Sequence, residues 1–293
     1  ASDKKLIIAP AMNPQMMSHP ATQRNIEQLK KDGAIFIDSE AGEMACGEEG
    51  FGRMAEPESI FKFIQNISLH NSHIKGQTLK GKKCLVTSGP TRESIDPVRY
   101  ISNYSSGKQG YAIAEELATR GAEVKLITGP TCLSANENIE VIDVESAEDM
   151  MKACQNQLPV DIAICAAAVS DWKPKEKAKT KIKKQSNPEP PMLSLIQNPD
   201  ILAELSKSGK KRPKLVIGFA AESEHLIENA MVKIEKKKCD LIVANNIEGG
   251  DVFESDENSV TVISQKGVVK EIKQQPKNLI ASQLCDIIEQ HVN

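Results

Sequence analysis

The sequence predicts an α/β protein with an open, mostly parallel, doubly wound (Rossmann-like) sheet that ends in a C-terminal β-hairpin. From Lys83 onward, apolar runs typical of strands alternate with stretches typical of helices. These runs lack the period-two alternation of half-exposed strands, as a parallel sheet covered on both faces requires. Two short runs around Lys266–Gly267 end the pattern. Such a pair of runs with a glycine between them predicts the hairpin.

The first segment, residues 1–72, predicts a partial flavodoxin-like α/β segment. Residues 4–9 suit a buried strand, and residues 19–33 suit a helix that stops at Gly33. A second strand, a glycine-rich loop and a helix with Pro57 near its start follow. These elements make up about a third of a doubly wound domain and cannot close a sheet alone. Since the chain begins with Ala and reaches a strand almost at once, we interpret its N-terminus as a cut through a larger polypeptide or a start within a domain.

A polar linker, residues 73–82, leads into the main domain, residues 83–293. The strand-like runs of this domain are, in chain order, KCLVTS, EVKLIT, EVIDV, DIAICAAA, KLVIGFAA and LIVANN. The helix-like stretches cover residues 107–120, 146–157, 198–207, 225–238 and 277–291. Ligands of such sheets bind beyond the carboxyl ends of the strands. We therefore expect the residues that follow these runs to converge on one crevice.

The composition argues against nucleic-acid and membrane proteins. The 293 residues carry a net charge of −3 and only 3% aromatic residues, whereas nucleic-acid binders show a basic face and aromatic stacking residues. No apolar run approaches the roughly 18 residues of a membrane span, and no signal peptide is visible. The seven cysteines form no CxxC pair, which favours free thiols in a reducing cytosol over a disulfide or zinc framework. We therefore expect a cytoplasmic protein that binds small ligands.

The stretch RYISNYSSGKQG matches neither common phosphate-binding motif. G-x-G-x-x-G is absent, and Lys108 lacks the upstream glycine and the following Ser or Thr of a P-loop. The strand EVKLIT is followed by GPT, so no carboxylate stands where a dinucleotide ribose would need one. The sequence therefore disfavours a dinucleotide site.

The same stretch predicts an anion site at the start of a helix. Ser106 and Gly107 open the helix, and its free N–H groups and positive dipole end attract an anion. Arg99 offers a planar fork for an acid group, and Asn103 can both donate and accept hydrogen bonds. The alternative is simple capping of the helix by a serine.

A second candidate site lies in residues 165–185, CAAAVSDWKPKEKAKTKIKKQ. The small residues at the strand end let a base or a sugar lie against the backbone. Asp171 suits a ribose or a magnesium ion carried by phosphates. The lysines after it, Lys181 among them, would close over a polyphosphate and neutralise charge in the transition state. A solvated surface loop is the alternative.

Three further features lie later in the chain. Asn198 would cap a helix that has Pro199 at its first position, a structural role. Phe219 would stack on a base or belong to the core. Lys233 and Lys237 are four residues apart on one helix face, where they would hold phosphates or lie in solvent.

In the first segment, Asn13 follows a strand and Cys46 lies in the glycine-rich loop. An exposed thiol there would serve as a general acid, and an inert loop cysteine is the alternative.

The ordered motifs TSGPTRESIDPVRYISNYSSGKQG, AAAVSDWKPK, KIKKQ, NPDIL, GFAAE and LIVANN together resemble one family. It is the phosphopantothenate–cysteine ligase half of the bacterial bifunctional coenzyme A biosynthesis flavoproteins. PAMNPQMM and ACGEEGFGRM resemble the C-terminal part of the other half, the phosphopantothenoylcysteine decarboxylase.

This resemblance implies CTP-dependent ligation of 4′-phosphopantothenate with L-cysteine in coenzyme A biosynthesis. The carboxylate of 4′-phosphopantothenate would attack the α-phosphorus of CTP and release pyrophosphate. The amine of cysteine would then displace CMP from the acyl-cytidylate, and Mg²⁺ would accompany the triphosphate. The family further implies a homodimer through the ligase domain, with the hairpin helping to build the interface, and a higher oligomer in the full-length parent.

Carried over position by position, the resemblance assigns three groups of residues. The substrate and the acyl intermediate would contact Asn13, Arg99, Asn103, Ser106 and Gly107. CTP would contact Cys165, Ala166, Ala167, Asp171, Lys181, Pro199, Asp200, Ile201, Leu202, Phe219, Lys233 and Lys237. The catalytic residues would be Asn103, Lys181 and, as the proton donor of the decarboxylation, Cys46; Asp171 would approach Mg²⁺ through the phosphates.

The chain departs from the family pattern at its front. The flavin-binding part and the catalytic histidine expected before Asn13 are absent from these 293 residues. We therefore expect that this fragment neither binds FMN nor decarboxylates, whereas the full-length parent would use FMN. Two other functions stay open. One is an NAD(P)-binding reductase, and the other is a non-catalytic nucleotide-binding module with the lysine run as a docking surface.

Overall fold

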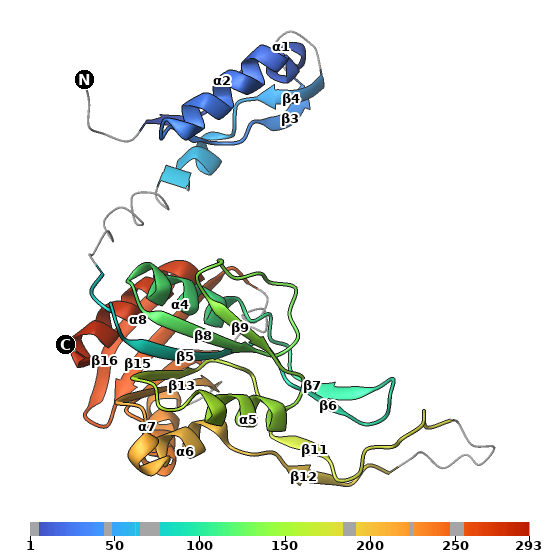
Figure 1. Cartoon of the computed structure of the whole chain (residues 1–293), viewed down its shortest axis with the longest axis vertical. Helices are drawn as coiled ribbons and strands as arrows, with labels where there is room; N and C mark the ends of the chain where they lie inside the picture. Colours follow the sequence, from blue (N-terminus) through green and yellow to red (C-terminus); the bar gives the residue numbers. More distant parts are fainter. Residues whose placement is uncertain are drawn as a thin grey trace. The chain divides into compact units, whose positions relative to one another are not determined.

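The computed structural model describes most of the chain as two compact units, Ala1–Ile74 and Lys75–Asn293 (Figure 1). The described residues are 6–43, 49–61, 63–64, 77–183, 192–222, 225–246 and 255–292. Among the described residues of the first unit, residues 57–61 are helical, and the labelled elements are a short parallel pair of strands, two helices and an antiparallel hairpin. They are β1 (Ile7–Ile8), α1 (Pro14–Ser18), α2 (Pro20–Lys31), β2 (Ile35–Phe36), β3 (Glu40–Glu43) and β4 (Glu49–Arg53).

The sequence predicted the order of the other elements in this unit and missed the short helix α1 and one hairpin. Gly33, with φ at +96°, follows the end of α2 as expected, since a left-handed residue there favours glycine. The glycine-rich loop instead pairs with itself as β3 and β4. Its repeated glycines carry no apolar alternation, so it gave no strand signal.

The second unit is built on one eight-stranded sheet in the order β16-β15-β14-β13-β10-β5-β8-β9. The strands β5, β8, β9, β10, β13 and β14 run parallel, and β15 and β16 are antiparallel. Their bounds are β5 (Lys83–Ser88), β8 (Glu123–Thr128), β9 (Glu140–Asp143), β10 (Ile162–Cys165), β13 (Leu215–Glu222), β14 (Leu241–Asn246), β15 (Glu257–Ser264) and β16 (Gly267–Pro276). This confirms the predicted mostly parallel sheet with a C-terminal hairpin.

Helices cover both faces of this sheet (Figure 1). One face carries α4 (Lys108–Thr119) and α8 (Lys277–Val292). The other carries α5 (Ala147–Gln157), α6 (Ile201–Ser206) and α7 (Leu226–Lys237). Because both faces are covered, neighbouring residues of one strand are buried together, as Leu85 and Val86 are. This is why the strands appear in the sequence as continuous apolar runs.

The strand order places a switch point between β5 and β10. The chain adds β8 and β9 on one side of β5, then returns to add β10, β13 and β14 on the other. In open parallel sheets, the crevice at such a reversal, beyond the carboxyl ends of the strands, is where ligands bind. The fold therefore selects the tips of β5, β10 and β13 as the place for a site.

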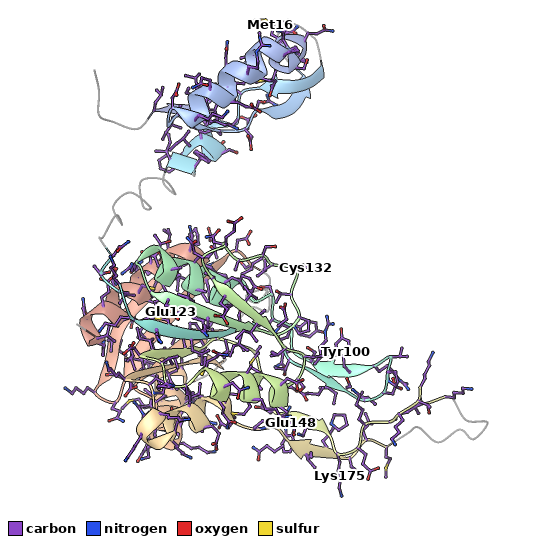
Figure 2. All side chains as sticks on the ribbon, in the orientation of Figure 1. Met16, Tyr100, Glu123, Cys132, Glu148 and Lys175 are labelled. Carbon is purple, nitrogen blue, oxygen red and sulfur yellow. The ribbon has the colours of Figure 1, made fainter. Side chains whose placement is uncertain are left out.

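Two small ladders, which the sequence did not predict, project beside this crevice (Figure 1). β6 (Arg92–Ser94) pairs with β7 (Tyr100–Ser102), and β11 (Trp172–Pro174) pairs with β12 (Leu195–Gln197). β6 and β11 contact each other. Figure 2 shows Tyr100 and Lys175 on this projecting part and Glu123, the first residue of β8, at the opposite end of the sheet.

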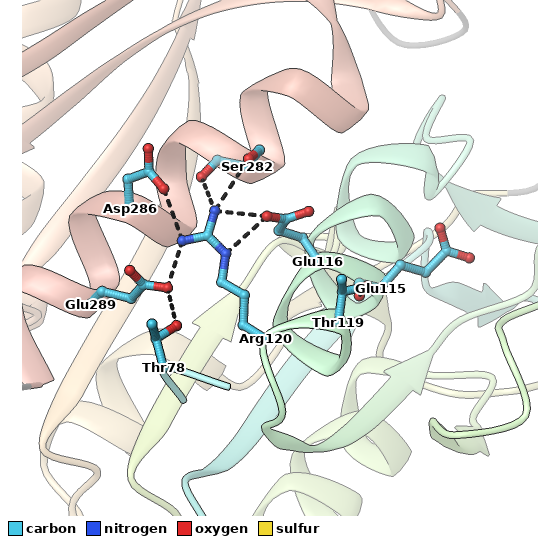
Figure 3. A network of polar contacts seen from close by, with 8 residues as sticks. All are labelled: Thr78, Glu115, Glu116, Thr119, Arg120, Ser282, Asp286 and Glu289. Atoms are coloured by element: carbon cyan, nitrogen blue, oxygen red, sulfur yellow. Dashed lines mark hydrogen bonds and ion pairs between the residues drawn. The ribbon is translucent and has the colours of Figure 1, made fainter. Parts of the chain in front are cut away.

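Arg120 fastens α4 to α8 in the second unit (Figure 3). Its side chain is 1% exposed and its guanidinium binds three carboxylates: Glu116 at 2.7 Å, Asp286 at 2.8 Å and Glu289 at 2.7 Å. It also donates to the backbone oxygen of Ser282 at 2.8 Å. Glu289 accepts a further hydrogen bond from Thr78, just before β5. The last helix is thereby bonded both to α4 and to the start of the unit.

Candidate functional site

Two cavities open at the carboxyl ends of the central strands. The α4 cavity, with a volume of about 160 Å³, is lined by the start of α4, by residues 166–168 after β10 and by Lys277 of α8. The α6 cavity, with a volume of about 350 Å³, is lined by the segment before and at the start of α6 and by two lysines of α7. Ala167 and Phe219 line both cavities. The two cavities therefore meet at the tips of β10 and β13.

The start of α4 forms one wall of the α4 cavity. Its N-cap is Gly107, with φ at +78°, and no side chain caps the helix. Serine capping, the structural alternative for this stretch, is therefore wrong. Ser88 Oγ donates to the backbone oxygen of Gly107 at 2.8 Å, and a Cβ on Gly110 would lie 2.4 Å from that Oγ. The glycines let the helix start sit directly against the tip of β5, where the N-cap residue has no side chain to bond the first N–H groups of the helix.

Two lysines give the α4 cavity its positive charge. Lys277 is buried, and its Nζ donates to the backbone oxygen of Ser255 at 2.5 Å. Lys108 pairs with Asp256 at 2.6 Å. Burial and the neighbouring charge of Lys108 lower the pKa of Lys277. Sequence reasoning missed Lys277 because a lysine at the start of a helix, far along the chain, gives no local sign that it reaches this cavity.

The α6 cavity has a different helix start from the predicted one. Asp200 caps α6: its Oδ1 accepts from the backbone N–H of Ala203 at 3.0 Å, and its other oxygen pairs with Lys237. The predicted cap, Asn198, is wrong. Asn198 is buried and its Nδ2 donates to the backbone oxygen of Ser170 at 2.8 Å. Its Oδ1 has no hydrogen-bond partner in the part of the chain that the structure describes.

The structure brings most of the residues assigned to CTP around the α6 cavity. Its lining includes Cys165, Ala167, Asp171, Pro199, Asp200, Ile201, Leu202, Phe219, Lys233 and Lys237. Burial raises the pKa of the Cys165 thiol well above its ordinary value, so the thiol stays protonated. Ala166 lines the α4 cavity, as do Ser106 and Gly107.

Asn103 and Arg99 lie on either side of β7 and line neither cavity. The Nδ2 of Asn103 donates to the backbone oxygen of Ala168 at 3.1 Å, which places the amide beside the α4 cavity wall. Arg99 instead binds the Asp96 carboxylate at 2.5 Å and the backbone oxygen of Ile182 at 2.9 Å. The side chain of Lys181, next to Ile182, is exposed.

In the first unit, Asn13 caps α1 by accepting from the backbone N–H of Gln15 at 2.8 Å, and Cys46 falls outside the described residues. Among the described residues there is no cluster of three or more His, Cys, Asp or Glu side chains that would hold a metal ion. Asp171 and Asp200 both line the α6 cavity, and Asp200 pairs with Lys237. Asp171 is a donor that suits Mg²⁺ only when phosphates supply further ligands. No helix in the described part of the chain has the length and apolarity to cross a membrane.

The chain is similar to known proteins over nearly its whole length. Residues 79–292 match the family described as DNA/pantothenate metabolism flavoprotein C-terminal domain, and residues 1–69 match the family described as Flavoprotein. The "Coenzyme A biosynthesis bifunctional protein CoaBC" of Haemophilus influenzae is 41% identical over 292 residues, covering 99% of this chain and 71% of that protein. Its Bacillus subtilis namesake is 42% identical over 268 residues, covering 90% of this chain and 64% of that protein.

A solved structure agrees with these matches. The crystal structure of the C-terminal domain of a CoaBC protein has a TM-score of 0.62 and 38% identity. The match covers 73% of this chain and 97% of that one. The chain therefore belongs to the family of the coenzyme A biosynthesis bifunctional proteins.

Proposed function

We propose that the unit Lys75–Asn293 catalyses the CTP-dependent ligation of 4′-phosphopantothenate with L-cysteine. The observation that carries this proposal is the pair of cavities that share Ala167 and Phe219. Ligation through an acyl-cytidylate needs a phosphorylated acid and a nucleotide that meet at one point, namely the carboxylate and the α-phosphorus. Two adjoining cavities at a switch point suit that requirement.

The α4 cavity suits the phosphorylated acid. It combines the positive dipole end of α4 with the positive charges of Lys108 and Lys277. Backbone N–H groups, a helix dipole and a partly desolvated ammonium group all favour an anion. Asn103, beside this cavity, would hold the carboxylate and the carbonyl of the acyl intermediate.

The α6 cavity suits the nucleotide. Lys233 and Lys237 of α7 lie at its wall and would bind phosphate oxygens, while Phe219 would contact the cytidine. Asp171 would hold Mg²⁺ carried by the triphosphate, and Mg²⁺ would neutralise phosphate charge there. Lys181 would contact the reacting phosphate from the adjoining segment.

The protein residues bind and orient the reactants and need not form a covalent bond. The carboxylate of 4′-phosphopantothenate attacks the α-phosphorus, pyrophosphate leaves, and the cysteine amine then displaces CMP to form the amide. The protonated state of Cys165, the cysteine at this site, supports a mechanism without a protein thiolate. Positioning and charge neutralisation supply the rate enhancement.

The test is pyrophosphate release with a panel of CTP, ATP, GTP and UTP in the presence of 4′-phosphopantothenate and cysteine. We expect turnover with CTP, and Lys181→Gln and Asn103→Ala should each lower kcat by roughly 100-fold. Lys214→Gln is the matched control, because Lys214 is exposed and pairs with Asp161 at the amino ends of the central strands, opposite the cavities. Wild-type rates in both site variants would discard this site. Binding of NADPH without pyrophosphate release would favour the reductase, and nucleotide binding without any turnover would favour the non-catalytic module.

A further inference from the structure

Asp96 is a buried carboxylate that accepts hydrogen bonds from three residues. It lies in the turn between β6 and β7, and its side chain is fully buried. Oδ1 accepts from the backbone N–H groups of Val98 at 2.8 Å and Arg99 at 2.9 Å. Oδ2 accepts from the Arg99 guanidinium at 2.5 and 3.1 Å and from the backbone N–H of Ile182 at 3.1 Å. Ile182 is 86 residues further along the chain.

Asp96 and Arg99 together hold both backbone polar groups of Ile182. The N–H of Ile182 donates to Asp96, and its carbonyl accepts from Arg99 at 2.9 Å. Four residues earlier, the N–H of Ala178 donates to the backbone oxygen of Ile95 at 2.9 Å. The segment 178–182 is therefore bonded to the β6–β7 turn at both of its ends. Lys181 lies within this segment with its side chain exposed.

The same β6–β7 ladder fixes Asn103. Asn103 directly follows β7 and donates to the backbone oxygen of Ala168. Thr91, just before β6, is bonded to the same segment, because its N–H donates to Ala168 and its Oγ1 accepts from the N–H of Ser170 at 3.0 Å. One short ladder thus carries both the segment of Lys181 and the residue Asn103, and it is bonded to the tip of β10.

We propose that Asp96 is a positioning residue of the ligase, whose carboxylate, together with Arg99, holds Ile182 and so sets the place of Lys181 relative to Asn103. This inference rests on the proposed function. Asparagine cannot replace the carboxylate, because both Oδ1 and Oδ2 accept hydrogen bonds and the amide nitrogen would face N–H donors in either orientation of the side chain. The bond to Arg99 lowers the pKa of Asp96, so the carboxylate is ionised at neutral pH.

A double-mutant cycle separates positioning from a general structural role. Asp96→Asn should lower kcat by about 100-fold, the effect of displacing a catalytic group by about 1 Å, with the KM for CTP changed less than about threefold. In a Lys181→Gln background the same substitution should cause no further loss of kcat, because its effect passes through Lys181. Asp161→Asn is the matched control. Asp161 accepts from the backbone N–H of Lys83 at 3.0 Å at the amino ends of the central strands, so kcat and the KM for CTP should stay unchanged.

Hydrogen exchange tests the contact itself, with or without turnover. The backbone N–H groups of Ala178 and Ile182, which have acceptors in the β6–β7 turn, should be protected in the wild type. The N–H of Ile182 should exchange faster in Asp96→Asn, measured well below the melting temperature, which should itself fall because a buried ion pair loses one partner. Asp96→Glu keeps a carboxylate and provides a second variant in case Asp96→Asn does not fold. It should lose less protection from exchange and less kcat than Asp96→Asn.

The outcomes are distinct. Wild-type kcat in a folded Asp96→Asn, or losses that multiply with those of Lys181→Gln, would overturn the inference. Absence of pyrophosphate release from the wild type would instead refute the proposed function, and the exchange measurement would still decide whether Asp96 holds the segment.

Discussion

At the scale of single residues, Gly110 sets how closely α4 approaches the tip of β5. A Cβ on Gly110 would lie 2.4 Å from Ser88 Oγ and 2.6 Å from Ser88 Cβ. We predict that Gly110→Ala lowers the free energy of unfolding by about 1–3 kcal/mol through overpacking. It should also raise the KM for 4′-phosphopantothenate, because the helix start moves away from the α4 cavity. Denaturant titration and saturation kinetics measure the two effects.

A second substitution checks this explanation. Ser88→Gly removes Oγ and Cβ, the two atoms that an alanine at position 110 would meet most closely, and leaves the Cα of residue 88 at 3.2 Å. The double variant should therefore recover part of the KM lost in Gly110→Ala. A KM that stays raised in the double variant would mean that the glycine acts by another route.

Lys277 should give the α4 cavity an alkaline limit. Burial and Lys108 lower its pKa below the ordinary value of 10.5. Between the lowered folded pKa and 10.5, the unfolded chain binds more protons than the folded one, so the contribution of Lys277 to stability rises with pH in that window. Binding changes in the opposite direction, because the neutral amine no longer attracts a phosphate. The KM for 4′-phosphopantothenate should rise at a pH below the usual lysine range.

The variant Lys277→Met keeps an apolar side chain of similar reach and should remove this alkaline limb from the pH profile of KM. It should also raise KM near neutral pH, where the charge is present in the wild type. An alkaline limb that persists in the variant would assign it to another group.

Single residues also show what sequence reasoning could and could not predict. It identified Asp200 and Asn198 near a helix start, yet it chose the wrong cap, since both residue types cap helices and Pro199 suited the first helical position. The bond of Asn198 to Ser170, 28 residues away, decided the outcome. Arg99 likewise offered a fork for an acid group, and the acid it binds in the structure is Asp96.

At the scale of helices and strands, Arg120 should be the residue on which the packing of α4 against α8 depends most. Its removal leaves Glu116, Asp286 and Glu289 close together without their shared cation. We predict that Arg120→Met lowers the free energy of unfolding by about 3–5 kcal/mol, the usual effect of removing one partner of a buried ion pair.

Glu140→Ala is the control for this prediction, because Glu140 is a largely exposed partner of Lys125 at 3.2 Å. It should change the free energy of unfolding by less than about 1 kcal/mol. Denaturant titration compares the two variants directly. An equal, small effect in both would show that the Arg120 ion pairs contribute little beyond those of a surface pair.

The sequence predicted long elements and missed short ones for a physical reason. β5, β8 and α5 agree with their predicted residues within one position, because a buried strand or an amphipathic helix repeats its signal over several residues. The ladders of β6–β7 and β11–β12 are three residues long and mix buried, half-buried and exposed positions, so they leave no periodic pattern. The β6–β7 turn nevertheless holds residues 178–182 through hydrogen bonds between residues that are far apart in the sequence.

At the scale of the whole molecule, the unit Lys75–Asn293 should fold and act without the first unit. The buried clusters that join the sheet to its helices consist of residues from 79 onward. We predict that a chain of residues 75–293 releases pyrophosphate with CTP at a kcat/KM within about twofold of the longer chain. A much lower value would show that residues 1–74 contribute to the ligase site.

The sequence predicted the fold class and the location of the crevice, but it did not predict the arrangement of two adjoining cavities. Alternation of apolar runs and helices fixed the sheet class, and the switch point located the crevice. That Ala167 and Phe219 separate two cavities depends on how β10 and β13 end side by side. Sequence patterns report only on nearby residues, and Ala167 and Phe219 are about 50 positions apart, so the sequence alone could not show that they lie together.

The beginning and the end of the second unit lie together, with consequences for protein engineering. Thr78 binds Glu289, and Lys82 Nζ donates to the backbone oxygen of Val292 at 3.1 Å. A short peptide linker would join these two ends, and new ends would be opened at the exposed Lys266 in the tight turn between β15 and β16. Such a circular permutant should keep the crevice intact and offer a fusion point on the side of the molecule away from it.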